Sequence, residues 1–268
     1  MSRMATTAAD DLQDDFALDE HFDPDDFPQA AQSPESPTEP EQNIAKKRKQ
    51  PAAEPTAPAE KKKHRKEAAA FVVPTTSPEQ CKMWNTHMHK VYKSLTQLEL
   101  ADIAITATNI YPTDLDPAAP TYFDELVASA LSTGKANKKV MLGAPQVLVL
   151  CSSALRVLEL VRRLRPVSRR AVAKLFSRHV KIDVQREMLG KSAVDVAVGT
   201  PNRVRRLLQG GDLKLNRLRL VVVDCWQDHK MRTVVDMDDT RDDLFAIWRD
   251  VLLPASKNPD YGFRMRLV

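Results

Sequence analysis

The sequence has few of the residues that build covalent or metal-bound frameworks. Its three cysteines, Cys81, Cys151 and Cys225, form no C-x-x-C pair. This arrangement implies no disulfide framework and favours a reducing compartment, the cytosol or the nucleus. His87 and His89 are two residues apart and would point in different directions on a helix, so we expect no tetrahedral metal site.

Long apolar runs, a secretory leader and a phosphate-binding loop are also lacking. No apolar stretch approaches the roughly 20 residues of a membrane span, and the first residues are acidic rather than basic and then apolar. The pattern G-x-x-x-x-G-K-[ST] is missing, because residues 132–135 (S-T-G-K) have neither its first glycine nor its final hydroxyl. We therefore expect no membrane partner, no small-molecule substrate and no cofactor.

Charge is distributed unevenly along the 268 residues. Residues 1–41 contain twelve Asp or Glu and one Arg, a net charge of −11. Residues 42–66 contain nine Lys or Arg and two Glu, a net charge of +7, and residues 67–268 have a net charge of +8. An acidic arm followed by basic blocks indicates a nucleic-acid partner or a highly charged assembly.

Residues 1–70 are predicted to form a disordered tail, because they contain too few branched apolar residues to offset the entropy of folding. The acidic part is either a solubilising segment or a segment that folds against a basic partner. The basic part holds two clusters that fit a bipartite nuclear import signal and would also bind phosphates. A solvated charge run is the alternative. The clusters are Lys46, Lys47, Arg48 and Lys49, then Lys61, Lys62, Lys63, Arg65 and Lys66.

Residues 71–268 are predicted to fold as one α/β lobe with its core in 145–268. The predicted strands are 146–151, 172–176, 194–198, 218–224 and a last strand that begins near 267. The predicted helices are parts of 79–105, then 122–131, 154–164, 182–189, 202–209 and 244–253, the last ended by Pro254, with a loop over 106–120. Strands that are apolar on both faces and alternate with helices predict a parallel sheet covered by helices.

The segments at the ends of these strands resemble the motifs of two related protein families. Residues 198–203 (V-G-T-P-N-R) resemble the V-G-T-P-G-R segment of DEAD-box RNA helicases, and 224–227 (D-C-W-Q) stand where those helicases have D-E-A-D. Residues 152–156 (S-S-A-L-R), 172–176 (V-A-K-L-F), 198–203 and 221–224 (V-V-V-D) carry a closer resemblance, which extends over residues 80–268. They resemble the Cms-one family, small eukaryotic proteins with a degenerate DEAD-like lobe. This resemblance implies a single RecA-like lobe and a role in the early small-subunit pre-ribosomal particle, the small-subunit processome, in the nucleolus.

The helicase resemblance also implies contacts with the RNA backbone beyond the carboxyl ends of two strands, where parallel sheets bind ligands. Thr200 and Pro201 would open a helix whose free N–H groups favour a phosphate, and Arg203 would add a bidentate contact. The alternative is a mere helix start and a surface charge. The predicted RNA-binding residues are Ser152, Ser153, Arg156, Thr200, Pro201, Asn202 and Arg203.

The departures from the helicase pattern predict a lobe without catalysis. Cys225 replaces the glutamate that polarises the attacking water, so ATP hydrolysis is not expected. Asp224 is either a structural relic or a residual Mg²⁺ ligand, and Trp226 either packs or stacks on a base. A further basic group is predicted to be a solvated face that partly touches RNA. This group consists of Arg162, Arg163, Arg165, Arg169 and Arg170.

The function expected from these patterns is a non-catalytic RNA-binding assembly factor for the small ribosomal subunit, acting in rRNA processing in the nucleus and nucleolus. Its expected partners are precursor rRNA or a snoRNA, together with processome proteins. One alternative is a protein-docking scaffold without RNA contact, and a second is a residual ATP-binding or NTPase protein. Charge reversal Arg203→Glu is expected to weaken RNA association without unfolding the lobe.

Overall fold

The computed structural model describes residues 72–132, 141–258 and 261–268, all within one unit of the chain that spans Ala68–Val268. The predicted tail, with both import clusters, lies outside the described residues. Most of the S-T-G-K segment lies outside them as well.

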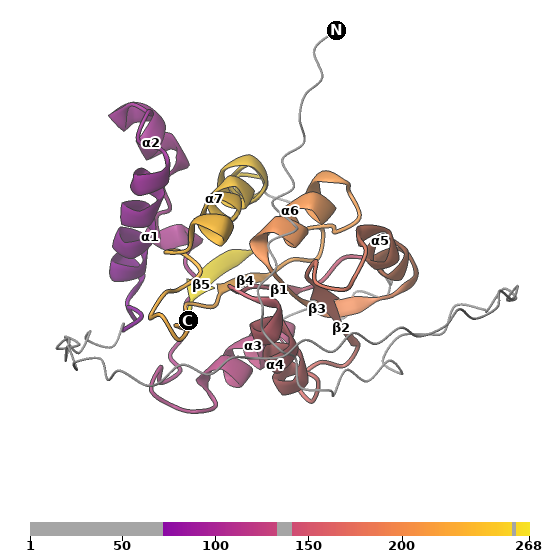
Figure 1. The fold of residues 1–268 in the computed structure, drawn as a ribbon. Coiled ribbons are helices and arrows are strands. Elements are labelled where there is room, and N and C mark those ends of the chain that lie inside the picture. Colours follow the sequence, from indigo (N-terminus) through magenta and orange to yellow (C-terminus); the bar gives the residue numbers. More distant parts are fainter. Residues whose placement is uncertain (1–71, 133–140, 259–260) are drawn as a thin grey trace, which may run out of the picture. The chain divides into compact units, whose positions relative to one another are not determined.

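A single parallel sheet, with strand order β2-β3-β1-β4-β5, forms the centre of the lobe (Figure 1). The strands are β1 (Val147–Leu150), β2 (Ala171–Leu175), β3 (Val194–Gly199), β4 (Leu220–Val223) and β5 (Arg264–Leu267). Every residue of β1, β3 and β4 is buried, which is why these strands read as uninterrupted apolar runs. An isolated parallel bridge between Ile110 and Met265 extends the sheet beyond β5.

Helices cover both faces of this sheet, in two layers that Figure 1 shows on opposite sides. α3 (Tyr122–Ser132) and α4 (Ala154–Leu164) pack on one face against alternate strand residues such as Val149 and Val222. The other face is covered by α1 (Ser77–Val91), α5 (Ile182–Lys191), α6 (Pro201–Gln209) and α7 (Asp238–Ile247). The predicted α/β lobe, with a parallel sheet covered by helices, is confirmed.

The prediction that Pro254 ends a helix is wrong. α7 begins at Asp238, continues through a π-helical segment (η3, Trp248–Leu252) and ends as α8 (Leu253–Ser256). Pro254 lies in the first turn of α8, where a backbone N–H is not required for a helical hydrogen bond. The wider π-helical turn therefore allows the helix to continue past Pro254, a residue that would end a regular α-helix.

The region 79–105 contains α1 and a second helix, α2 (Gln97–Ile103), which starts at a capping box between Thr96 and Glu99. α1 is fastened to the outer edge of β5 by Gln80, whose side chain is buried. Its Nε2 donates to the Leu267 carbonyl at 3.0 Å, and its Oε1 accepts from the Leu267 N–H at 3.2 Å. The amide thus satisfies backbone groups that an edge strand would otherwise leave open.

The last strand, β5, starts at Arg264, three residues before the predicted start. Its two arginines conceal the strand pattern in the sequence. Arg266 is nevertheless buried, because its guanidinium donates to Tyr122 Oη at 3.1 Å and to the carbonyls of Tyr111 at 3.2 Å and Thr75 at 2.7 Å. A buried arginine of this kind is tolerated only when its donors are satisfied.

Candidate nucleic-acid interface

The carboxyl ends of three neighbouring strands bring the predicted polar residues to one edge of the sheet. Ser152 and Ser153 follow β1, Thr200 follows β3 and Asp224 follows β4. The connection after β1 leads through α4 to β2, whereas the chain after β4 continues to β5 on the other side. The strand order therefore reverses between β1 and β4, the place where open α/β sheets bind ligands.

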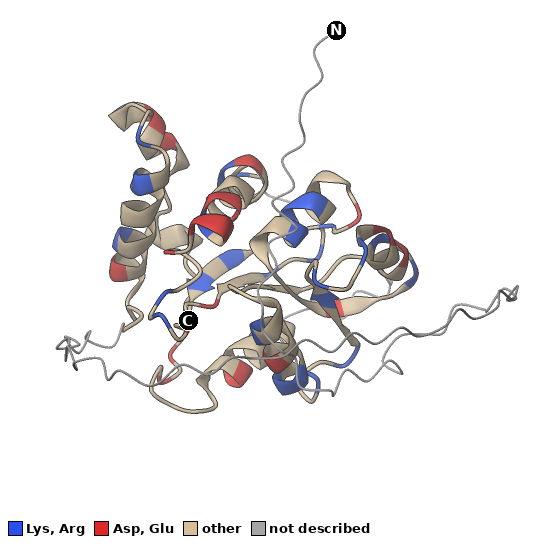
Figure 2. Cartoon of the chain, in the orientation of Figure 1, with Lys and Arg blue, Asp and Glu red and all other residues tan. Residues whose placement is uncertain are grey.

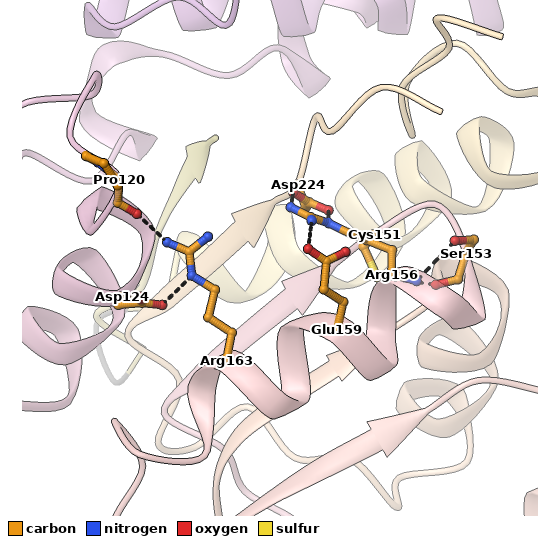
Figure 3. A network of polar contacts seen from close by, with 8 residues as sticks. All are labelled: Pro120, Asp124, Cys151, Ser153, Arg156, Glu159, Arg163 and Asp224. Carbon is orange, nitrogen blue, oxygen red and sulfur yellow. Dashed lines mark hydrogen bonds and ion pairs between the residues drawn. The ribbon is translucent and has the colours of Figure 1, made fainter. Parts of the chain in front are cut away.

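An ion pair within the chain fills this switch point. Arg156, in the first turn of α4, donates from Nε to Asp224 Oδ2 at 2.8 Å and from Nη2 to Oδ1 at 3.0 Å (Figure 3). The Arg156 and Asp224 side chains are only 11% and 3% exposed. Burial alone would lower the pKa of Arg156, but its hydrogen bonds to Asp224 and Glu159 raise that pKa above the ordinary value. Arg156 is thus a charged structural partner rather than a free surface cation.

The same ion pair determines what Asp224 can do. Both carboxylate oxygens accept hydrogen bonds from Arg156, so a cation at Asp224 would have to displace the guanidinium. Burial raises the pKa of Asp224, and the guanidinium of Arg156 opposes that rise. The next side chain is the buried Cys225 thiol, whose pKa burial also raises, so it is neutral at neutral pH and a poor proton acceptor.

Ser152 and Ser153 form the turn from β1 into α4. Ser153 is the N-cap of α4, and its Oγ accepts a hydrogen bond from the Arg156 backbone N–H at 3.3 Å. Ser152 is 7% exposed. Both serines therefore shape the strand-to-helix turn, and an RNA contact by either remains a prediction.

Thr200, Pro201 and Asn202 open α6 as the sequence predicts. Thr200 is the N-cap, but its side chain makes no capping hydrogen bond, and Pro201 occupies the first turn. Asn202 Nδ2 donates to Asp243 Oδ2 at 2.9 Å, while its buried Oδ1 has no hydrogen-bond partner among the described residues. The start of α6 therefore keeps polar capacity that the described part of the lobe does not use.

Arg203 lies inside the lobe, so the alternative that it is a surface charge is wrong. It is 3% exposed, and Nη1 donates to Gln185 Oε1 at 3.3 Å. Gln185 is itself buried and donates from Nε2 to the carbonyls of Lys174 and Phe176, both at 3.0 Å. Charge reversal at Arg203 would place a carboxylate in this interior. We therefore expect that variant to lose stability, contrary to the expectation that the lobe stays folded.

Trp226 lies beside the ion pair and is 45% exposed. The Arg156 guanidinium carbon is 5.3 Å from its ring centroid, so the ring is packed on a cation while a large part of its surface faces solvent. Stacking of a base on Trp226 remains a prediction.

Several residues of this edge escape sequence reasoning. Glu159 is three residues after Arg156, and this i, i+3 spacing on a helix was a readable signal for their ion pair at 2.8 Å. Gln185 and Asp243 reach the site from α5 and α7, so only the tertiary structure reveals their contacts with α6. Asp243 also binds Arg205 at 2.7 Å.

The described residues offer no built metal site and no membrane segment. Among them, no group of three or more His, Cys, Asp or Glu side chains is arranged to hold a metal ion. No helix in the described ranges is long and apolar enough to cross a membrane.

Comparison with known proteins gives one family and several relatives. The family model CMS1, described as a U3-containing 90S pre-ribosomal complex subunit, matches residues 31–253. The chain is 32% identical over 168 residues to Protein CMSS1 of Homo sapiens, a match that covers 61% of this chain and 57% of that protein. It is 33% identical over 155 residues to Protein CMS1 of Chaetomium thermophilum, covering 54% of this chain and 61% of that protein. The matches thus span about three fifths of these relatives' length.

Among solved structures, the chain is similar to the yeast DEAD-box splicing factor Prp28. The TM-score is 0.43 at 12% sequence identity, and the match covers 62% of this chain and 39% of that chain.

Proposed function

The chain belongs to the CMS1 family of 90S pre-ribosomal complex subunits, and on this premise we propose that it is a non-catalytic, RNA-binding assembly factor of the small ribosomal subunit. Its place of action would be the nucleolus, where it would take part in rRNA processing. Precursor rRNA or a snoRNA, and proteins of the small-subunit processome, would be its partners. The family description supports this choice because it names both a pre-ribosomal complex and the U3 component.

One observation carries the non-catalytic part of the proposal, the Arg156–Asp224 ion pair at the switch point of the sheet. An NTPase places a metal ion, phosphates and an attacking water at such a position. Here the guanidinium of the chain itself occupies both oxygens of Asp224, and the neutral Cys225 follows. The geometry supports a lobe that binds without turning over a nucleotide.

The proposed RNA contact at this edge is the start of α6, where the helix N-terminus favours a phosphate and the Thr200 side chain makes no capping hydrogen bond. Asn202 would act from beside this contact, with its Nδ2 held by Asp243. Ser153 and Trp226 would contribute from the neighbouring strand ends. Arg156 and Arg203 would act indirectly, because each fixes the shape of this edge from a buried or largely buried position.

The test is ultraviolet crosslinking of the tagged protein in cells, followed by sequencing of the bound RNA and mapping of the crosslinked peptides. Reads concentrated on small-subunit precursor rRNA or its guide snoRNA are expected, with adducts near 152–156, 200–206 or Trp226. If reads from these RNAs are no more abundant than in an untagged control, the result would contradict direct RNA binding.

A protein-docking scaffold is the second candidate, and a specific observation favours it. The arginines Arg156 and Arg205 at the carboxyl-end edge form ion pairs with Asp224 and Asp243, which reduces the charge available for phosphates. Co-purification of processome proteins that survives ribonuclease treatment and high salt, without RNA crosslinks, would support the scaffold.

A further inference from the structure

A row of arginines lies at the edge of the sheet opposite the site described above. All five strands are parallel, so their starts lie together at the amino-terminal edge of the sheet. Arg169 and Arg170 precede β2, Arg217 and Arg219 precede β4, and Arg264 begins β5. We call these five residues the amino-edge row.

Backbone contacts join the members of this row across the sheet. The Arg264 N–H donates to the Arg219 carbonyl at 2.9 Å, and the Arg219 N–H donates to the Gln146 carbonyl at 2.8 Å, at the start of β1. Arg170 and Arg217 both bind the buried carboxylate of Asp195 on β3, each at 3.5 Å. These contacts hold four members of the row in fixed positions along one edge of the sheet.

Three members of the row keep their charge available. Arg169 and Arg264 are exposed and Arg219 is partly exposed. Within the described residues, none of the three side chains makes a hydrogen bond or ion pair. Asp195 meanwhile offers one carboxylate to two guanidinium groups, so Arg170 and Arg217 add a net positive charge. Figure 2 shows further Lys and Arg positions in blue on α4, which leads to this edge, whereas α7 carries Asp and Glu in red.

We propose that the amino-edge row binds the phosphate backbone of RNA. This inference rests on the proposed RNA-binding function and assigns its main electrostatic surface to the edge opposite the start of α6. From β2 to β5 the row crosses four strand intervals of about 4.8 Å each, roughly 19 Å in all. A row of that length suits a repeating polyanion better than a single anionic group, and guanidinium groups bind phosphate oxygens bidentately.

The test uses the full chain in a background where the nine basic tail residues of the two import clusters are replaced by Gln, so that the tail adds no phosphate binding of its own. In that background the amino-edge variant is Arg169→Gln, Arg219→Gln and Arg264→Gln. Arg170 and Arg217 are kept because they neutralise the buried Asp195. A control with the same net charge is Lys82→Gln, Lys90→Gln and Lys93→Gln, three exposed lysines on or just after α1.

Binding of a 30-nucleotide single-stranded RNA is measured by fluorescence anisotropy over a range of KCl concentrations, after thermal melts show equal stability. The amino-edge variant is expected to bind at least about tenfold more weakly at low salt. The slope of log K against log salt should fall by about two for single-stranded contacts. The lysine control should keep most of the affinity and the slope. Arg264→Gln alone should give a smaller change in the same direction.

Two results would overturn the inference while leaving the proposed function intact. In the first, the amino-edge variant binds RNA as the parent does. In the second, the lysine control loses as much as the amino-edge variant, which would mean that only net charge matters. If the parent chain with its native tail binds no RNA, the proposed function fails together with the inference. Capture of a polyglutamate peptide in place of RNA would assign the row to an acidic protein and likewise overturn it.

Discussion

At the scale of single residues, Arg156 is expected to stabilise the lobe through its buried ion pair with Asp224. Arg156→Ala would leave the Asp224 carboxylate buried without its bidentate partner, and losing one member of a buried pair costs about 3–5 kcal/mol. Urea unfolding followed by circular dichroism measures the loss.

Two further variants complete that experiment. Glu159→Gln is the matched control, because the Glu159 side chain is 60% exposed and its surface pair is worth about 1 kcal/mol or less. The double change Arg156→Met with Asp224→Leu should recover much of the loss, since apolar groups of similar size replace a buried pair well. A single-variant loss no greater than that of Glu159→Gln would contradict the structural role of Arg156.

Gly199, at the end of β3, provides a second test at this scale. A Cβ there would lie 2.5 Å from the Leu175 carbonyl oxygen and 2.7 Å from Val204 Cγ2, so Gly199→Ala forces the strand and α6 apart. We expect a loss of about 1–3 kcal/mol in unfolding free energy.

Gly190 in α5 is the paired control for Gly199. A Cβ added at Gly190 would meet no neighbouring atom within 4 Å, so Gly190→Ala should stabilise the helix by about 0.5–1 kcal/mol. Thermal melts of both variants measure the two changes in stability. Equal effects of the two alanines would mean that the close approach at Gly199 is not a constraint.

The three thiols should differ in reactivity. Burial raises the pKa of Cys151 and Cys225 far above the ordinary range, whereas Cys81 is only partly buried and its pKa is raised less strongly. Thiolate, rather than thiol, reacts with disulfide reagents. When the native chain is treated with a disulfide reagent at pH 8, Cys81 should therefore be labelled first. The other two cysteines should react only after denaturant is added. Rapid labelling of Cys225 in the folded chain would contradict its burial.

At the scale of elements, α6 connects the site to the core, and its inward and outward faces should respond differently. Arg203→Glu would set a carboxylate beside Gln185 in the interior, so we expect a loss of about 3 kcal/mol or more. Gln209→Glu places the same carboxylate at an exposed position of α6 and should change stability by about 0.5 kcal/mol. Urea midpoints of the two variants check this. Similar midpoints would show that Arg203 is not needed in the interior.

At the scale of the whole molecule, a lobe whose switch point is filled by its own ion pair should not gain stability from nucleotide. A ligand at a hundred times its dissociation constant adds about 2.7 kcal/mol to the stability of the folded state. We expect no change in Tm on adding millimolar ATP and Mg²⁺ to the full chain. A clear rise would favour the residual ATP-binding alternative, and the same scan with Arg156→Gln would show whether the guanidinium is what blocks the site.

The sequence by itself determined the layered lobe, because strands buried on both faces must be continuously apolar and helices must show apolar spacing. β1, β3 and β4, and the helices α4 and α6, carry those local signals and were predicted close to their observed bounds. The end of the helix after Trp248 was not predicted correctly, because a π-helical segment that accommodates Pro254 has no periodic pattern in the sequence.

Only the tertiary structure decided the state of the predicted site. Arg156 and Asp224 are 68 positions apart, and Arg203 meets Gln185 from another helix, so no local pattern shows that these charges are paired or buried. The amino-edge row has the same origin, because its arginines come from three separate strand starts. Local hydrophobic pattern fixes the elements, whereas the pairing and exposure of each charge depend on which elements the parallel sheet brings together.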